Sequence, residues 1–363
     1  MTLALSVEDL RERSGVRWLP GAEIDAARRR LGQWMDALGL GPIETPSRVT
    51  LARPGMTLKA YGHAHGNAPA VLLVPAPIKR AYILDLAPRA SVVQECLEAG
   101  TQAYAIQWER PSLFEQSFGL YEYADRLILD CLDAVQAESG ERQAFLVGHS
   151  LGGTLAAIFA ALHPERVRGL VLLGAPLCFG PGIGVFGPVV ATAPPSPLLT
   201  ALLGNVPGSF LDMVSFAAAP VTFGPSRWLD WLASLPDSQT LQTHLRVERW
   251  TLDESPLARQ LFEDVVDLLY REDRFARGSL VVGSRRVGPE LVHAPILAVV
   301  SASCRVVPPE SVLPFLRATQ SPDTRVLWYA GDTGVALQHV GMLVGQNAHR
   351  QLWPEITRWL GGG

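Results

Sequence analysis

Ser150 is the residue whose type and setting point most directly to chemistry. It is the centre of a Gly-x-Ser-x-Gly sequence at positions 148–152, between an apolar run, 144–147, and an Ala-rich run, 154–162. A buried strand, a tight turn of small residues and a helix form a nucleophile elbow, in which the glycines let strand and helix pass closely and the serine hydroxyl is exposed. We therefore expect Ser150 to be a nucleophile at the carboxyl end of a sheet; the alternative is a Gly-rich turn with an inert serine.

A serine hydroxyl is a weak nucleophile until a base removes its proton, and histidine is the usual base. In the chain order Ser, acid, His that accompanies such an elbow, the histidine lies in the loop after the last strand. His339 lies ten residues past a strand predicted to end at Tyr329, so we expect it to be the base. His149 is expected to line the substrate pocket or to pack beside the nucleophile, and His349 to lie on the surface.

The acid of this set is not evident. It should follow the predicted strand 295–300, but the residues after this strand contain no carboxylate before Glu310. Asp332, in the loop that leads to His339, is the nearest remaining candidate, although a loop aspartate is often only a turn residue. Cys304 could orient the imidazole only weakly, because a thiol with a pKa of about 8.5 is mostly neutral near pH 7.

Two backbone amides are candidates for an oxyanion hole. The amide of Leu151 follows the nucleophile and is the first donor expected at such an elbow. The second donor should come from the loop after the apolar run 70–74, where Ile78 has an amide N–H but Pro75 and Pro77 have none.

The elements that must hold these residues alternate along the chain. Apolar runs typical of buried parallel strands alternate with helical patterns, which predicts a parallel sheet covered on both faces. Before them we expect an amphipathic helix with a solvated basic face and an antiparallel pair of strands. The strands are expected at 48–51, 57–61, 70–74, 102–108, 144–147, 169–174, 295–300 and 325–329, and the helices at 22–40, 91–99, 121–138, 154–162 and 347–360.

The alternation stops after the sixth predicted strand. Residues 177–208 are dense in Gly and Pro, and residues 210–275 are mostly helical by pattern. So many apolar and aromatic residues are unlike a flexible linker, and they indicate a helical cap over the site. We therefore predict the α/β class: a mostly parallel α/β-hydrolase core at 1–176 and 279–363, interrupted by a cap subdomain at 177–278.

The composition limits the classes of function. The 363 residues carry a formal net charge of −4 and no long basic run, so no nucleic-acid partner is expected.

The first residues lack the apolar region of a signal peptide, and no apolar stretch approaches the roughly 20 residues that span a bilayer. The chain is therefore expected to be cytoplasmic and not membrane-spanning. No cofactor or metal site is expected. The four cysteines are widely spaced and have the settings of buried or free thiols, not of disulfides or zinc ligands: Cys96, Cys131, Cys178 and Cys304.

Several segments resemble the polyhydroxyalkanoate (PHA) synthases. Residues 74–86 are similar to the synthase sequence Pro-Pro-x-Ile-Asn-Lys-x-Tyr-Ile-Leu-Asp-Leu, and residues 250–256 to Trp-x-x-Asp-Ser-Pro. Segments 205–211, 307–311 and 339–341 also match in order and spacing, so that the resemblance extends from about Thr45 to Leu360. The length is similar to that of the short synthases that act with a second, non-catalytic subunit.

The resemblance implies an α/β-hydrolase fold, a covalent acyl-enzyme and ester formation from (R)-3-hydroxyacyl-CoA. It places Ser150 at the family's nucleophilic cysteine, Cys304 at its aspartate and His339 at its histidine. Two of the three positions therefore differ from the family pattern, and the serine favours oxygen-ester chemistry over exchange between thioesters.

Three functions fit these observations. The leading hypothesis is a PHA-synthase-like serine acyltransferase that moves an acyl group from acyl-CoA, or another acyl thioester or ester, through Ser150 to an alcohol. The runner-up is a serine esterase or thioesterase, in which water accepts the acyl group. The third is a catalytically weak homologue that binds polymer granules or a partner. A second synthase-type subunit or a second copy of this chain is the expected protein partner.

Overall fold

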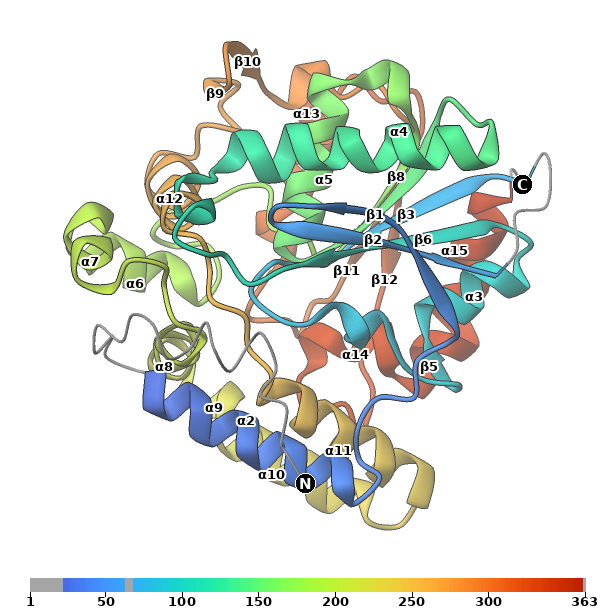
Figure 1. Cartoon of the computed structure of the whole chain (residues 1–363), viewed down its shortest axis with the longest axis vertical. Helices are drawn as coiled ribbons and strands as arrows, with labels where there is room; N and C mark the ends of the chain where they lie inside the picture. The colour runs from blue at the N-terminus through green and yellow to red at the C-terminus, as the bar shows by residue number, and fades with distance from the viewer. Residues whose placement is uncertain (1–21, 63–67, 362–363) are drawn as a thin grey trace, which may run out of the picture.

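A computed structural model describes residues 22–62 and 68–361, and an eight-stranded sheet forms its centre (Figure 1). The order across the sheet is β1-β2-β6-β3-β7-β8-β11-β12. Neighbouring strands from β6 to β12 are parallel, whereas β2 is antiparallel to both of its neighbours. All eight predicted strands are confirmed, with these bounds: β1 (Ser47–Arg53), β2 (Met56–Tyr61), β3 (Ala70–Val74), β6 (Gln102–Trp108), β7 (Ala144–His149), β8 (Val167–Leu173), β11 (Ile296–Val300) and β12 (Thr324–Trp328).

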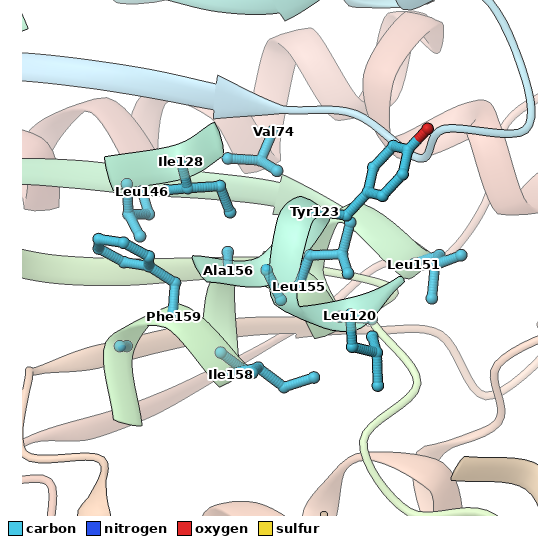
Figure 2. Packing of buried hydrophobic residues seen from close by; sticks show 14 of the residues in the cluster. Val74, Leu120, Tyr123, Ile128, Leu146, Leu151, Leu155, Ala156, Ile158 and Phe159 are labelled. Carbon is cyan, nitrogen blue, oxygen red and sulfur yellow. The ribbon is translucent and has the colours of Figure 1, made fainter. Parts of the chain in front are cut away.

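Side chains alternate between the two faces of the sheet and build a hydrophobic core on each face. In β3, Leu72 and Val74 belong to one core, whereas Val71 and Leu73 belong to the other. Because both faces are buried at β3 and β11, every residue of these two strands is apolar, which explains their continuous hydrophobic runs. Figure 2 shows part of the first core, with Leu146 of β7 and Leu155 of the helix after Ser150 among the labelled side chains.

Helices cover both faces of the sheet (Figure 1). The first core lies against α4, α5 and α13, and the second lies against α3, α14 and α15. Their bounds are α3 (Val92–Glu98), α4 (Leu127–Ser139), α5 (Leu151–Leu162), α13 (Leu313–Ala318), α14 (Gln338–Val344) and α15 (Trp353–Leu360). Two short hairpins lie outside the main sheet: β4 (Asp85–Ala87) with β5 (Ala90–Ser91), and β9 (Leu280–Val282) with β10 (Arg285–Val287).

The chain leaves the main sheet after β8 and returns to it at β11, and the segment 177–278, here called the cap segment, is mostly helical. It lies to one side of the sheet, at the left and lower left of Figure 1. Its elements are α6 (Phe186–Thr192), α7 (Ser196–Leu203), α8 (Gly208–Ala218), α9 (Pro220–Phe223), α10 (Pro225–Ser234), α11 (Ser238–Thr251), α12 (Arg259–Asp264) and the π-helical η5 (Val265–Arg271). Within the two described ranges, no single helix has the length and apolar composition needed to span a membrane; α6 and α7 meet that test only together, across an 88° bend.

The predicted N-terminal helix is α2 (Ala22–Ala37), and it packs along the cap segment (Figure 1). The prediction of a solvated basic face is wrong for Arg28, whose guanidinium lies 2.7 Å from Asp212 and 2.9 Å from Glu254. Asp36 of the same helix lies 2.7 Å from Arg249. The charge pattern of the helix could not show these ion pairs, because every partner belongs to a distant part of the chain.

Candidate active site

Ser150 lies at the turn between β7 and α5, and its backbone is strained. Its φ of 54° and ψ of −131° fall in a region that residues other than glycine rarely adopt. The amide of Ser150 donates to the carbonyl of Leu173 on β8 (3.0 Å), and its carbonyl accepts the amide of Gly153 (2.9 Å). A strained serine between a strand and a helix is the geometry of a nucleophile elbow.

Two glycines make this turn possible. A Cβ at Gly148 would lie 2.4 Å from the Cα of Gly153, and a Cβ at Gly152 would lie 2.1 Å from the carbonyl oxygen of Val74. Both clashes are with backbone atoms, so any larger residue would push α5 away from β7 or β3. The Gly-x-Ser-x-Gly spacing therefore permits the close approach that an elbow requires.

His339 is the second residue of α14 and lies against His149. The two ring centroids are 4.8 Å apart, and Nε2 of His149 lies 3.0 Å from the carbonyl oxygen of His339. Because a carbonyl only accepts, His149 must carry its proton on Nε2. Ser150, His149 and His339 line one cavity, so the structure brings together the predicted nucleophile, base and pocket histidine.

The other ring nitrogen of His339, Nδ1, faces Cys304. The distance from Nδ1 to Sγ is 3.5 Å, and Sγ also accepts the amide of Val307 at 3.4 Å. Burial raises the pKa of the Cys304 thiol, which is therefore neutral at pH 7. Sulfur is a weak donor and a weak acceptor, so this contact orients the imidazole less firmly than a carboxylate does.

Both imidazoles are neutral at pH 7. Burial lowers the pKa of His339 well below its ordinary 6.5, and the neighbouring His149 lowers it further. Burial lowers the pKa of His149 to about 4, although its hydrogen bond to the carbonyl of His339 opposes this shift. Nε2 of His339 is buried and has no hydrogen-bond partner among the residues of the described ranges. A neutral imidazole with an unpartnered nitrogen can act as a base.

The structure does not bring Asp332 to the imidazole of His339. Its carboxylate accepts the hydroxyl of Tyr329 (2.8 Å) and the amides of Asn347 (2.8 Å) and Ala348 (3.2 Å). These bonds tie the loop after β12 to the chain that follows α14, and they occupy the carboxylate. Cys304, and not Asp332, therefore lies where a triad acid would be.

The two predicted oxyanion donors, Leu151 and Ile78, line the same cavity as Ser150. Leu151 begins α5, and the first amides of a helix have no acceptor within the helix. Ile78 lies in the turn after β3, and its carbonyl accepts the amide of Ser255 at 3.4 Å. Amides held at a helix start and in a fixed turn suit the stabilisation of a developing oxyanion.

A cluster of charges that the sequence analysis missed joins the loop after β3 to the cap segment. Nζ of Lys79 lies 2.7 Å from Glu254 and 3.4 Å from Asp212, and Arg28 binds the same two carboxylates. Lys79 and Glu254 both belong to segments of the synthase resemblance, which is the signal that could have marked them.

Asp230 of α10 forms hydrogen bonds with the loop that precedes His339. Its carboxylate accepts the amides of Gly334 and Ala336, both at 2.8 Å, and lies 2.9 Å from Nδ1 of His244 on α11. Ala336 has a φ of 57°, which residues other than glycine rarely adopt, and its hydrogen bond to Asp230 helps to stabilise this conformation. The sequence gives no signal for this contact, because Asp230 and Gly334 are 104 positions apart.

The other side chains considered in the sequence lie away from Ser150 and His339, or do not form a metal site. The prediction that His349 lies on the surface is wrong: its ring is mostly buried, with nitrogens 2.8 Å from Glu95 and 2.9 Å from the carbonyl of Leu343. The four cysteines are buried and free, as predicted. Over residues 22–62 and 68–361, no group of three or more His, Cys, Asp or Glu side chains is arranged to hold a metal ion.

The site belongs to a cavity of about 490 Å³. Residues from the loops after β3, β8 and β11 and from the cap segment line it together with the elbow and His339. A cavity of this size can enclose much of a small-molecule ligand. The arrangement can thus bind an acyl substrate against a serine and a neutral base.

Comparisons with known proteins show what the chain is similar to. The alpha/beta hydrolase fold family matches residues 103–326. The poly(3-hydroxyalkanoate) polymerase subunit PhaC of Haloferax mediterranei is 33% identical over 292 residues, which are 80% of this chain and 58% of that protein. PhaC of Allochromatium vinosum is 26% identical over 340 residues, which are 92% and 94% of the two chains. The chain thus spans about three fifths of the length of its Haloferax and Haloarcula relatives.

Solved structures show the same fold. A soluble variant of monoglyceride lipase from Saccharomyces cerevisiae has a TM-score of 0.56 at 13% identity and covers 88% of this chain and 96% of its own. A monoacylglycerol lipase from Paleococcus ferrophilus has a TM-score of 0.52 at 18% identity, with coverages of 82% and 96%. At these identities the likeness concerns the fold alone. With sheet, elbow and family match in agreement, the chain belongs to the α/β hydrolase fold family, and the relatives most similar along its length include PHA polymerase subunits.

Proposed function

We propose that the chain is an acyltransferase of the PHA-polymerase type that uses Ser150 as its nucleophile. The observation that carries this proposal is the elbow: a strained serine and a neutral histidine line one cavity, in a chain similar to PHA polymerase subunits along most of its length. We infer acyl-CoA or another acyl thioester as the donor. The acceptor is an alcohol, such as the hydroxyl end of a growing polyester.

The reaction has two steps. In the first, Oγ of Ser150 attacks the thioester carbonyl and its proton moves to Nε2 of His339, while the amides of Leu151 and Ile78 donate to the carbonyl oxygen as it gains charge. The C–S bond then breaks, and the leaving thiolate takes the proton from His339 and departs as a thiol. In the second step His339 takes the proton of the alcohol, the new ester bond forms, and the proton returns to Oγ as its bond to the acyl group breaks.

Hydrolysis is the second candidate function, and the identity of residue 150 favours it. The synthase pattern has cysteine at this position, whereas an acyl group on Ser150 is an ordinary oxygen ester. With water in place of the alcohol, the same first step makes the chain an esterase or thioesterase. A catalytically weak homologue that binds polymer or a partner is the third candidate, and Cys304 in the place of the acid favours it.

An activated-serine probe separates the two enzymes from the weak homologue. Wild type and Ser150→Ala are treated with a fluorophosphonate, and the intact masses are measured. We expect one added probe on the wild type and none on Ser150→Ala. If no adduct depends on Ser150, both enzyme proposals are contradicted.

Incubation with 3-hydroxyacyl-CoA separates transfer from hydrolysis. Released thiol and product masses are followed with and without an added alcohol. We expect products with the mass of the acyl group joined to the alcohol. Thiol release that yields only free acid at every alcohol concentration would contradict the transferase and support the hydrolase.

The relatives are named as polymerase subunits, and we propose that this chain also works with a second subunit or as a homodimer. Its mass in solution by light scattering, alone and with a candidate second subunit, tests this. A cytoplasmic location, and the division into a core at 1–176 and 279–363 with a cap subdomain at 177–278, stay predictions.

A further inference from the structure

We propose that the cavity beside Ser150 selects a medium-length apolar acyl chain, hexanoyl to dodecanoyl, over short acyl groups such as acetyl or butyryl. This inference rests on the proposed acyl-enzyme, because the chain that is selected is the one carried by Ser150. Three observations lead to it: the chemistry of the cavity wall, the way that wall is held, and the cavity volume.

Aliphatic and aromatic side chains from separate elements form one part of the wall. Phe179 follows β8, Phe186 and Val190 belong to α6, and Val266 and Tyr270 belong to η5. The ring of Tyr270 lies 4.8 Å from that of Phe179 and 6.4 Å from that of Phe186, with the rings edge to face in both pairs. Such a wall has few groups that a polar acyl substituent could bind, and it favours methylene groups.

Hydrogen bonds at the back of this wall hold it in place. Asp273, just after η5, accepts the amide of Phe179 at 3.0 Å. Arg271 donates to the carbonyls of Ala193 (2.9 Å) and Pro194 (2.7 Å), which joins η5 to the end of α6. The π-helical form of η5 is itself an uncommon conformation that is frequent at functional sites. These hydrogen bonds fix the wall of the cavity, so the cavity is not a gap left between loosely packed helices.

The volume exceeds what a short acyl group needs. One small group such as a water molecule takes about 30 Å³ in a liquid. The cavity of about 490 Å³ is more than ten times this volume. Part of this space belongs to the reacting ester and the mouth of the cavity, so a chain of medium length fills the remainder. An acetyl group would leave most of the apolar wall uncovered.

The expected gain per methylene is measurable. Complete burial of a methylene group corresponds to about 0.8 kcal/mol, which is up to about a fourfold increase in kcat/KM. We therefore expect kcat/KM to rise about two- to fourfold per methylene from acetyl to octanoyl and to level off once the pocket is full.

Chain-length profiles with 4-nitrophenyl esters, from acetyl to myristoyl, test the inference. Wild type, Val190→Trp and Val266→Phe are compared with Leu202→Trp, whose site on α7 is 75% exposed and does not line the cavity. The two cavity variants should lower the ratio of decanoyl to butyryl turnover by about tenfold and shift the optimum to shorter chains, because each removes space for several methylenes. Leu202→Trp should keep the wild-type profile, and thermal unfolding identifies which variants are folded.

The outcomes separate this inference from the proposed function. A wild-type profile that is flat or falls from acetyl onwards contradicts the inference and leaves a Ser150-dependent enzyme intact. An unchanged profile in both folded cavity variants contradicts it equally. Turnover that is no lower in Ser150→Ala contradicts the proposed function and the inference with it, whereas a wild type that turns over no ester of any length contradicts the inference alone.

Discussion

Nδ1 of His339 faces a thiol where a serine triad has a carboxylate. A carboxylate accepts the Nδ1 proton, holds the tautomer in which Nε2 is free, and stabilises the imidazolium that forms. The thiol of Cys304, 3.5 Å away and neutral, does this only weakly. When the thiol donates to Nδ1 instead, the imidazole proton lies on Nε2 and the ring cannot accept the proton of Ser150. The identity of residue 304 should therefore limit the rate of acylation.

We predict that Cys304→Asp speeds the reaction of Ser150 with a fluorophosphonate. Loss of a triad aspartate lowers kcat by about 10⁴-fold in a serine protease, and we expect at least about a tenfold gain from restoring one here. Cys304→Ser is the control, because it changes the size of the group without adding a charge. Equal second-order rates for the wild type and the two folded variants would contradict the role given to this position.

The rate at which the fluorophosphonate labels Ser150 should not fall as the pH is lowered through 6.5; that is, the pH profile should have no acid limb there. His339 can act as a base only while it is neutral, and burial together with His149 lowers its pKa well below 6.5. The labelling rate of the wild type should therefore stay constant from about pH 8 to about pH 6. In Cys304→Asp the carboxylate stabilises the imidazolium and raises its pKa, so the limb should move toward 6.5. A wild-type limb at or above 6.5 would show that the imidazole is more hydrated than the structure indicates.

At the scale of elements, the position of His339 depends on a helix of the cap segment. Asp230 on α10 accepts two amides of the loop that leads into α14, and His339 is the second residue of α14. A displacement of about 1 Å in a catalytic group can lower a rate by about 100-fold. We predict that Asp230→Ala lowers kcat by about 10- to 100-fold with little change in KM, and that Asp230→Asn, which keeps one acceptor oxygen, lowers it less.

Asp237 provides the matched control for Asp230. It caps α11 by accepting the amide of Thr240 at 2.7 Å, and no hydrogen bond joins it to the loop before His339 in the described structure. Asp237→Asn should leave kcat unchanged while it slightly lowers the melting temperature. The coupling between α10 and His339 is refuted if folded Asp230→Ala has the kcat of the wild type, or if both variants lose activity only in proportion to stability.

The elements were the most predictable part of the molecule, because each carries its own periodicity. The apolar run 144–147, the small-residue turn and the Ala-rich run predicted the elbow around Ser150. The distance from the last strand pointed to His339, which lines the same cavity as Ser150; its role as the base stays a prediction. Asp332 illustrates the limit: its loop was identified, but the partners of its carboxylate come from Tyr329 and from the chain after α14. Such contacts depend on tertiary packing, which a local pattern does not contain.

At the scale of the whole molecule, buried neutral histidines make folding sensitive to acid. The pKa of His149 is about 4 in the folded chain and about 6.5 when unfolded. Below pH 6.5 the unfolded chain therefore takes up a proton that the folded chain does not, and stability that is present above pH 6.5 is lost as the pH falls toward 4. This one group corresponds to about 3 kcal/mol over that interval.

We predict that the free energy of unfolding falls between about pH 6.5 and 4 and that His149→Gln makes the fall shallower. The comparison uses the slope against pH, because the substitution also alters packing. His293→Gln is the control, since His293 is exposed. Denaturant titrations at several pH values measure the slopes; equal slopes for wild type and His149→Gln would mean that His149 is protonated in the folded chain.

The contacts between the sheet and the cap segment could not be predicted from the sequence. The parallel sheet and the helical cap segment follow from hydrophobic patterns, but the contacts that join them do not. Arg28, Lys79, Asp212 and Glu254 come from four separate segments and meet in one ion-pair cluster. No local pattern predicts this cluster, because only the folded chain brings these opposite charges together.

The central claim is that Ser150 carries the acyl group during turnover. The most direct measurement is rapid quenching of the enzyme with 3-hydroxyacyl-CoA, followed by mass spectrometry of the peptide that contains Ser150. The account predicts that this peptide gains the mass of the acyl group in the wild type and that Ser150→Ala gains none. An acyl group found on Cys304 or on another residue, or thiol release that continues unchanged in Ser150→Ala, would contradict it.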